Sequence, residues 1–143
     1  MATKVVLYVE DEADDLLFMQ MAFRKLGIAS RFRGARNGQE AVDYLSACGD
    51  DTAGGQAPAP ALILLDLNLP ILSGFEVLAW VREQPRFRSV PVIIFSSSDR
   101  PEDKLKAINL GANSFIRKPA SGAGFGQVIR SLCEQWPGLG ENP

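Results

Sequence analysis

The stretch LILLDLNLP, residues 62–70, joins the pattern of a buried strand to a charged side chain. Leu62 to Leu65 are consecutive aliphatic residues, as expected of a strand that is covered on both faces of its sheet. Asp66 follows directly, and a carboxylate in such surroundings loses several kcal/mol of hydration unless a positive group meets it. The stretch therefore predicts a buried parallel sheet and raises the question of what meets Asp66.

Strand-like and helix-like segments alternate on both sides of this stretch. Besides 61–65, β-rich runs lie at 4–9, 30–35, 91–95 and 113–116. Helical patterns follow them at 14–26, 37–47, from 73 onward, 101–111 and 122–136, with Asn37 and Ser73 as predicted N-caps. Five strands that alternate with five helices predict an α/β fold, a doubly wound parallel sheet with helices on both faces.

Polar residues follow four of the five predicted strands. Glu10 and Asp11 follow the first, Asp66 the third, Ser96 the fourth and Lys118 the fifth. Ligands of such sheets bind outside the carboxyl ends of the strands, so these side chains should converge on one rim. Clustered carboxylates repel each other unless a cation joins them, and oxygen ligands favour Mg²⁺. A carboxylate can attack phosphorus to give an acyl phosphate, which makes Asp66 the natural nucleophile, with Lys118 and Ser96 opposite the phosphoryl oxygens.

The composition argues against several other kinds of protein. The chain has no histidine, which removes Ser-His and Cys-His mechanisms and most zinc sites. Its net charge of −2 gives no electrostatic reason to expect nucleic acid as a partner. No apolar stretch approaches the length of a membrane span, and Cys48 and Cys133 are too far apart in sequence to suggest a disulfide framework. We therefore expect a cytoplasmic protein that binds neither nucleic acid nor membrane.

The whole chain, 1–143, is predicted to be one domain with a core of about 4–135. Residues 48–61 are rich in Gly, Ala, Pro and Asp, which predicts a flexible loop before the third strand. The tail, 137–143, is predicted to be loose.

Four motifs resemble the receiver domain of two-component response regulators: VEDEADD (9–15), LILLDLNLPILSGFEVL (62–78), PVIIFSSSD (91–99) and GANSFIRKP (111–119). The resemblance implies a flavodoxin-like fold with strand order 2-1-3-4-5. It also implies a phosphorylated, non-enzymatic signalling protein. The long loop before the third strand, the LLDLNLP motif and the absence of an output domain are most similar to single-domain regulators that partner bacterial phytochromes. A sensor histidine kinase, and more narrowly a bacterial phytochrome, is the partner that the resemblance implies.

The resemblance, carried over by position, assigns roles around the phosphoacceptor. Asp66 would be the phosphoacceptor and Asp11 a direct Mg²⁺ ligand. Glu10 would act on the ion largely through water, and the main-chain carbonyl of Asn68 would be a third ligand. Lys118 would hold a phosphoryl oxygen.

The family also implies a conformational switch on the strands beside the acceptor. Ser96 would move to hydrogen-bond the phosphoryl group, and Phe115 would change rotamer with it. The family further implies a cis peptide bond between Lys118 and Pro119, where proline lowers the penalty for the cis form.

Two surfaces are predicted to bind proteins. Leu17 and Met21 lie on the face of the first helix opposite its core stripe, which includes Phe18, and receiver domains present this face to the kinase. We also expect a homodimer, because a receiver without an output domain must pass its signal through a surface. The family usually uses helix four, strand five and helix five, and Trp136 and Leu139 could extend that surface.

Three alternatives to the phosphoacceptor reading remain to be weighed. A haloacid-dehalogenase-like phosphatase also has an Asp nucleophile, but its usual second Asp is Asn68 here, which cannot shuttle a proton. A flavodoxin-like cofactor binder would need a phosphate loop where this chain has EDEADD, which would repel phosphate. A scaffold receiver that is never phosphorylated would not need the intact rim.

Overall fold

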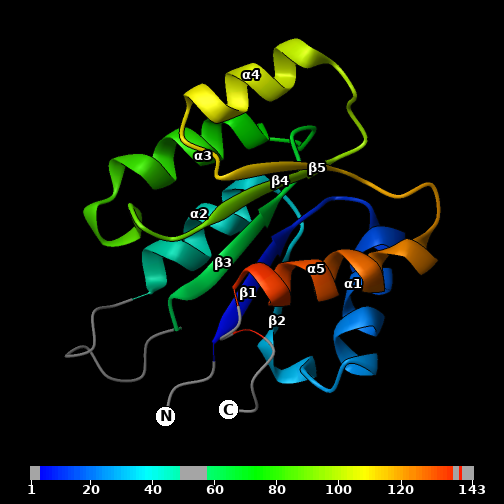
Figure 1. Ribbon diagram of the computed structural model, residues 1–143. Helices are drawn as coiled ribbons and strands as arrows, with labels where there is room; N and C mark the ends of the chain where they lie inside the picture. The colour runs from blue at the N-terminus through cyan, green and yellow to red at the C-terminus, as the bar shows by residue number, and fades with distance from the viewer. Residues whose placement is uncertain (1–3, 49–57, 137–138, 140–143) are drawn as a thin grey trace.

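The computed structural model describes residues 4–48, 58–136 and 139, which form a five-stranded parallel sheet flanked by helices (Figure 1). The sheet has the order β2-β1-β3-β4-β5, as predicted. Its strands are β1 (Val5–Val9), β2 (Phe32–Ala35), β3 (Pro60–Leu65), β4 (Val92–Ser96) and β5 (Ser114–Arg117).

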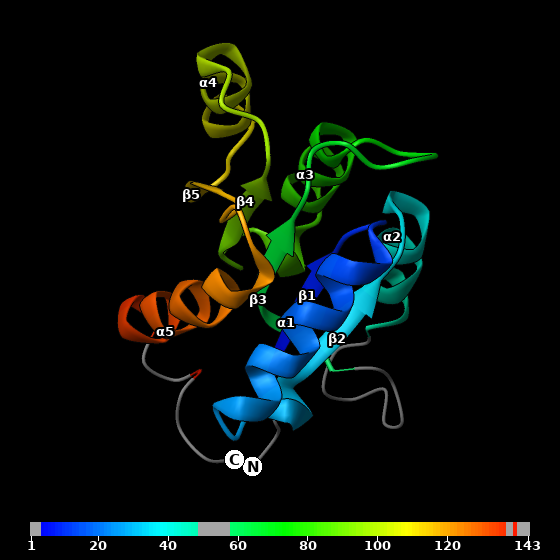
Figure 2. The same ribbon diagram turned by 90° about the vertical axis from the view of Figure 1, so that its right-hand side faces the viewer.

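Helices cover both faces of the sheet (Figure 2). One face carries α1 (Ala13–Lys25) and α5 (Phe125–Gln135), and the other carries α2 (Gly38–Ala47), α3 (Gly74–Glu83) and α4 (Pro101–Asn109). Short 3₁₀ turns, η1 (Ala29–Arg31), η2 (Pro85–Phe87) and η3 (Gly122–Gly124), precede β2, β4 and α5. No helix in the described part of the chain is long and apolar enough to cross a bilayer.

Side chains of β3 alternate between two hydrophobic cores. Leu62 and Leu64 pack beneath α1 and α5, whereas Ile63 and Leu65 pack beneath α2, α3 and α4, and all four are fully buried. Both faces of this strand are therefore covered, as the continuous apolar run predicted. The same alternation turns Asp66, the next residue, toward the α1 and α5 side.

Helix starts follow the predicted caps. The Asn37 side chain accepts a hydrogen bond from Glu40 N at 2.8 Å. Glu40 itself accepts from Arg36 N, so α2 has a cap without the reciprocal contact of a capping box. At α3, Ser73 and Glu76 make both contacts of the box, which fixes the first turn of this helix.

Several finer expectations are wrong. The peptide bond between Lys118 and Pro119 is trans, and no cis bond occurs among the described residues, because trans is the lower-energy form before proline wherever the chain direction permits it. β2 begins at Phe32 because Ala29 to Arg31 form the η1 turn. Phe18, assigned to the core stripe, lies at its edge and is 38% exposed.

The loop and tail predictions fall mostly on residues 49–57 and 137–143, which lie outside the described residues except for Leu139. Leu139 is buried against the core under α1 and α5. It therefore does not extend an exposed surface as expected, because its side chain packs into the core that contains Val6, Phe23 and Leu62.

Candidate functional site

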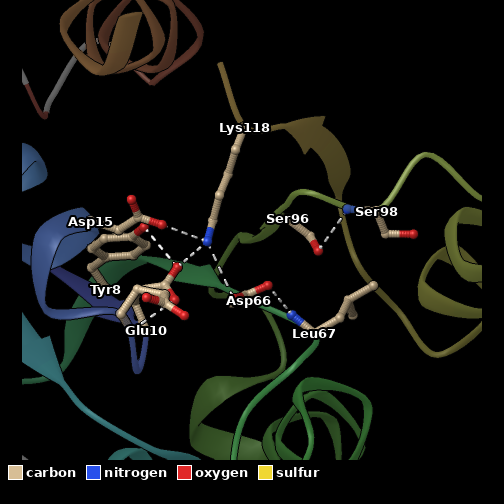
Figure 3. A network of polar contacts seen from close by, with 9 residues as sticks. Tyr8, Glu10, Asp15, Asp66, Leu67, Ser96, Ser98 and Lys118 are labelled. Carbon is tan, nitrogen blue, oxygen red and sulfur yellow. Dashed lines mark hydrogen bonds and ion pairs between the residues drawn. The ribbon is translucent and has the colours of Figure 1, made fainter. Parts of the chain in front are cut away.

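Asp66 lies at the carboxyl end of β3, where its side chain meets those of residues that follow β1 and β5, with Ser96 of β4 to one side (Figure 3). Its side chain is nearly buried, and Oδ1 accepts a hydrogen bond from Leu67 N at 2.7 Å. Oδ2 accepts from Lys118 Nζ at 3.3 Å. The carboxylate that follows the apolar strand therefore meets an ammonium group, as its burial requires.

Lys118 joins three carboxylates from three different elements. Its Nζ lies 2.5 Å from Glu10, 2.8 Å from Asp15 and 3.3 Å from Asp66. The Lys118 side chain is only 10% exposed, and its backbone N–H donates to the Ser96 carbonyl at 2.8 Å. Burial lowers the pKa of Lys118, but the hydrogen bonds to Asp15 and Glu10 and the charge of Asp66 together raise it above its usual value. The side chain is thus held as a cation.

Glu10 is fully buried beneath Lys118 and uses both of its oxygens. Oε1 accepts from the Tyr8 hydroxyl at 3.1 Å as well as from Lys118, and Oε2 accepts from Glu12 N at 3.2 Å. Burial raises the pKa of Glu10 to about 7, with a further increase from the charge of Asp66, although Lys118 acts in the opposite direction. Tyr8 lies two residues before Glu10, and the two side chains point to the same side of the sheet because alternate residues of a strand face the same way.

Three carboxylates of the rim can converge on a metal ion. Carboxylate oxygens of Glu10, Asp11 and Asp66 lie within 4.8 Å of one another. Asp11 is exposed and has no hydrogen-bond or ion-pair partner among the described residues, so its oxygens are available. An all-oxygen set of this kind suits a hard divalent cation, and the residues present therefore fit one.

Ser96 and Phe115 lie away from the carboxylate cluster. Ser96 is fully buried at the end of β4, and its Oγ accepts from Ser98 N at 3.3 Å. Within the described residues, Ser96 makes no hydrogen bond to Asp66. Phe115 is partly buried on the opposite face, against the core under α2, α3 and α4. Among the described residues, no hydrogen bond or ion pair therefore joins either residue to the acceptor.

The β3–α3 loop fixes the backbone of the acceptor. Gly74 N donates to the Leu67 carbonyl at 2.9 Å, and a Cβ at Gly74 would lie 2.1 Å from the Asp66 carbonyl oxygen. Only glycine permits this approach, which ties the start of α3 to Asp66. Asn68, on the same loop, is exposed.

One contact of the site was missed from the sequence: the ion pair between Asp15 and Lys118. Asp15 stands in the VEDEADD motif, four residues after Asp11 and in the first turn of α1, and this position was the available signal. Leu17 and Met21, by contrast, are 52% and 46% exposed on α1, as predicted.

A rim of carboxylates with an opposed lysine, on a sheet of this order, defines a phosphoacceptor signalling protein of the response regulator class. The family model described as response regulator receiver domain matches residues 6–130, and the chain belongs to that family.

Several solved structures are similar over nearly the whole chain. The phosphorylated cyanobacterial phytochrome response regulator RcpA is 32% identical, with 95% of each chain covered and a TM-score of 0.82. The response regulator RPA3017 in red light signalling of R. palustris is 32% identical, with 98% of each chain covered and a TM-score of 0.81. Rcp1 of Synechocystis sp. is 29% identical over 93% of this chain and 88% of Rcp1. The Mn²⁺-bound form of Rcp1 has a TM-score of 0.77, with 93% of this chain and 94% of that chain covered.

Proposed function

We propose that Asp66 accepts a phosphoryl group from a sensor histidine kinase and thereby switches a protein-interaction surface. An oxygen of Asp66 attacks phosphorus and forms a new P–O bond. The bond from phosphorus to the imidazole nitrogen of phosphohistidine breaks, its electron pair returns to that nitrogen, and the imidazole takes up a proton. The observation that carries this proposal is the Lys118 ammonium, which lies 3.3 Å from Asp66 and can bind a phosphoryl oxygen.

The proposal includes Mg²⁺ as the resident ion. Asp11 and Asp66 would bind it directly, with the main-chain carbonyl of Asn68. Glu10, which is fully buried and is the nearest ion-pair partner of Lys118, would act largely through water. When bound, Mg²⁺ supplies positive charge to the carboxylates and to the phosphoryl oxygens. The Mn²⁺-bound form of the relative Rcp1 supports a divalent ion at this rim.

We assign the switch to Ser96 and Phe115. Ser96 would exchange its contact with Ser98 N for a phosphoryl oxygen, and Phe115 would follow it by a change of rotamer. Turnover of external substrates is not part of the proposal, because a phosphatase of this type would need an acid or base where the chain has Asn68.

A bacterial phytochrome is the kinase that the comparisons support, since RcpA is a phytochrome response regulator and RPA3017 acts in red light signalling. We place its docking site on the exposed Leu17 and Met21, one turn apart on α1. The proposal also includes a cytoplasmic location, in keeping with the free thiols Cys48 and Cys133.

Labelling with acetyl phosphate and Mg²⁺ tests the acceptor. Intact-mass measurement should show the addition of a single phosphoryl group to the wild-type chain and none to Asp66→Asn. The matched control is Asp43→Asn, an exposed aspartate on α2 whose carboxylate accepts a hydrogen bond from Gln39 and makes no described contact with the rim, and it should be labelled like the wild type. A wild-type chain that stays unlabelled, or an Asp66→Asn chain that is labelled, would refute the proposal.

The docking face is tested with two donors. Leu17→Glu combined with Met21→Glu should slow transfer from a phytochrome kinase at least tenfold, about the loss of one apolar hot spot. Labelling by acetyl phosphate should be nearly unchanged, because this small donor needs no docking surface. Equal slowing with both donors would indicate damage to the fold, and no slowing with the kinase would place the docking face elsewhere.

A further inference from the structure

Asp15 forms an ion pair with Lys118 that none of the roles described above uses. The carboxylate comes from the first helical turns of α1, and Lys118 follows β5, 103 residues further along the chain. We infer that Asp15 is a positioning residue that sets the Lys118 ammonium for phosphoryl transfer. This inference rests on the proposed function of Asp66 and Lys118.

The distances show how the ammonium is shared. Nζ is closer to Glu10, at 2.5 Å, and to Asp15, at 2.8 Å, than to Asp66, at 3.3 Å. In Figure 3 the Lys118 side chain reaches down between Asp15 and Glu10 on one side and Asp66 on the other. An ammonium has three donors, and each of these carboxylates takes one. Asp15 and Glu10 therefore hold Nζ back from the acceptor.

This arrangement keeps negative charge on the attacking oxygen of Asp66. With Glu10 and Asp66 as its only partners, the ammonium would move onto Asp66 and neutralise the attacking oxygen more fully. Asp15 draws it toward α1, which leaves Asp66 more negative and leaves room beside it for a phosphoryl group. After transfer, Lys118 exchanges Asp66 for a phosphoryl oxygen and keeps Asp15 and Glu10. Asp15 is thus a contact that persists through the reaction.

The ion pair between Asp15 and Lys118 differs from an ordinary surface ion pair because it is largely buried. Exposed pairs contribute little, because water screens them and long side chains lose entropy. The side chains here are only 10% exposed for Lys118 and 23% for Asp15, and the contact is a charge-assisted hydrogen bond. Asp14, the preceding residue, carries the same charge in the same helical turn but is exposed and makes no hydrogen bond or ion pair with Lys118. It is therefore a matched control.

The experiment compares initial rates of aspartyl phosphate formation with acetyl phosphate at fixed Mg²⁺. In that reaction Asp66 displaces acetate, which leaves with the electron pair of its bond to phosphorus. Asp15→Ala should lower the rate at saturating donor about tenfold, the factor expected for one lost charge-assisted hydrogen bond. Asp14→Ala should stay within about twofold of the wild type at 0.15 M salt, where such an exposed charge is largely screened. Asp15→Asn, which keeps an oxygen acceptor, should give an intermediate rate.

The same substitution made in a chain that already carries Lys118→Ala shows whether Asp15 acts through Lys118. In a Lys118→Ala chain, adding Asp15→Ala should change the rate by less than about twofold, because the partner it positions is gone. Equal rates for Asp15→Ala and Asp14→Ala would overturn the inference, as would a full tenfold effect of Asp15→Ala in the Lys118→Ala background. Thermal melting identifies any variant that is slow because it is unfolded. A wild-type chain that is not labelled on Asp66 overturns the proposed function itself, whereas a labelled wild type with equal Asp14 and Asp15 variants overturns this inference alone.

Discussion

The helices α3 and α4 lie on the same face of the sheet but are held in different ways. α3 buries Gly74, Val77, Leu78 and Val81, and its start is closed by the capping box of Ser73 and Glu76. α4 buries only Ala107 in its nine residues, and its N-cap, Arg100, makes no side-chain cap hydrogen bond. One helix is therefore part of the core, whereas the other is a lightly attached surface element.

The difference in packing between α3 and α4 corresponds to a difference in how each helix contacts the site. α3 starts at Gly74, whose backbone packs directly against the Asp66 carbonyl, so a fixed α3 keeps the acceptor loop in one conformation. α4 is linked to the site by polar contacts: Ser98 N donates to Ser96 Oγ, and Ser98 Oγ donates to Asp103 at 2.7 Å. Few apolar contacts oppose a movement of α4, and such weakly buried elements are the ones that open or shift at low cost.

Gly74→Ala should have the largest effect on stability. The new methyl group would lie 2.1 Å from the Asp66 carbonyl oxygen, a backbone atom that cannot rotate away. We expect a loss of about 4 kcal/mol in the free energy of unfolding, above the usual cost of overpacking, together with a large loss of labelling by acetyl phosphate. Urea denaturation and intact-mass measurement check the two effects. A stable and normally labelled Gly74→Ala chain would show that α3 does not fix the acceptor loop.

Truncation of one leucine in each helix compares the two directly. Leu78 on α3 is fully buried, and Leu78→Ala should cost about 3 kcal/mol through lost burial and the remaining cavity. Leu105 on α4 is 63% exposed, and Leu105→Ala should stay within about 0.5 kcal/mol of the wild type. Both values follow from urea denaturation. Equal losses would mean that α4 is packed more firmly than its burial indicates.

Much of the sheet and of the rim was predictable because the deciding signals are local. Leu62 to Leu65 form an apolar run that only a strand covered on both faces can bury, and all four are fully buried. Asn37 and Ser73 accept hydrogen bonds from residues three positions away, so the starts of α2 and α3 depend on neighbours in the sequence. Glu10, Asp66 and Lys118 each follow a strand, and they lie close together because parallel strands end at the same edge of the sheet.

The missed and mistaken features depend on distant parts of the chain. The contact between Asp15 and Lys118 joins residues 103 positions apart and depends on how the first turn of α1 is rotated. The cis and trans forms before Pro119 differ by only about 0.5–1 kcal/mol, so tertiary context decides between them. Phe18 is 38% exposed at the edge of its stripe, and its core contact is with a distant residue, Phe125, on which it packs edge-to-face at 6.1 Å between ring centroids.

The smallest effect on stability is expected on the outer face of α4, which is part of the surface where we expect the homodimer to form. Leu105 and Ile108 are 63% and 42% exposed and lie one turn apart, so replacing both by Gln removes little buried surface. We expect the free energy of unfolding to change by less than about 0.5 kcal/mol. Light scattering should nevertheless show a dimer for the wild type and a monomer for the double variant, because apolar contact area drives association. Lys104→Gln, an exposed substitution on the same helix, is the control and should leave the dimer intact. A wild-type chain that is monomeric both with and without acetyl phosphate would exclude the homodimer, whereas a dimer that survives both substitutions would place its interface away from α4.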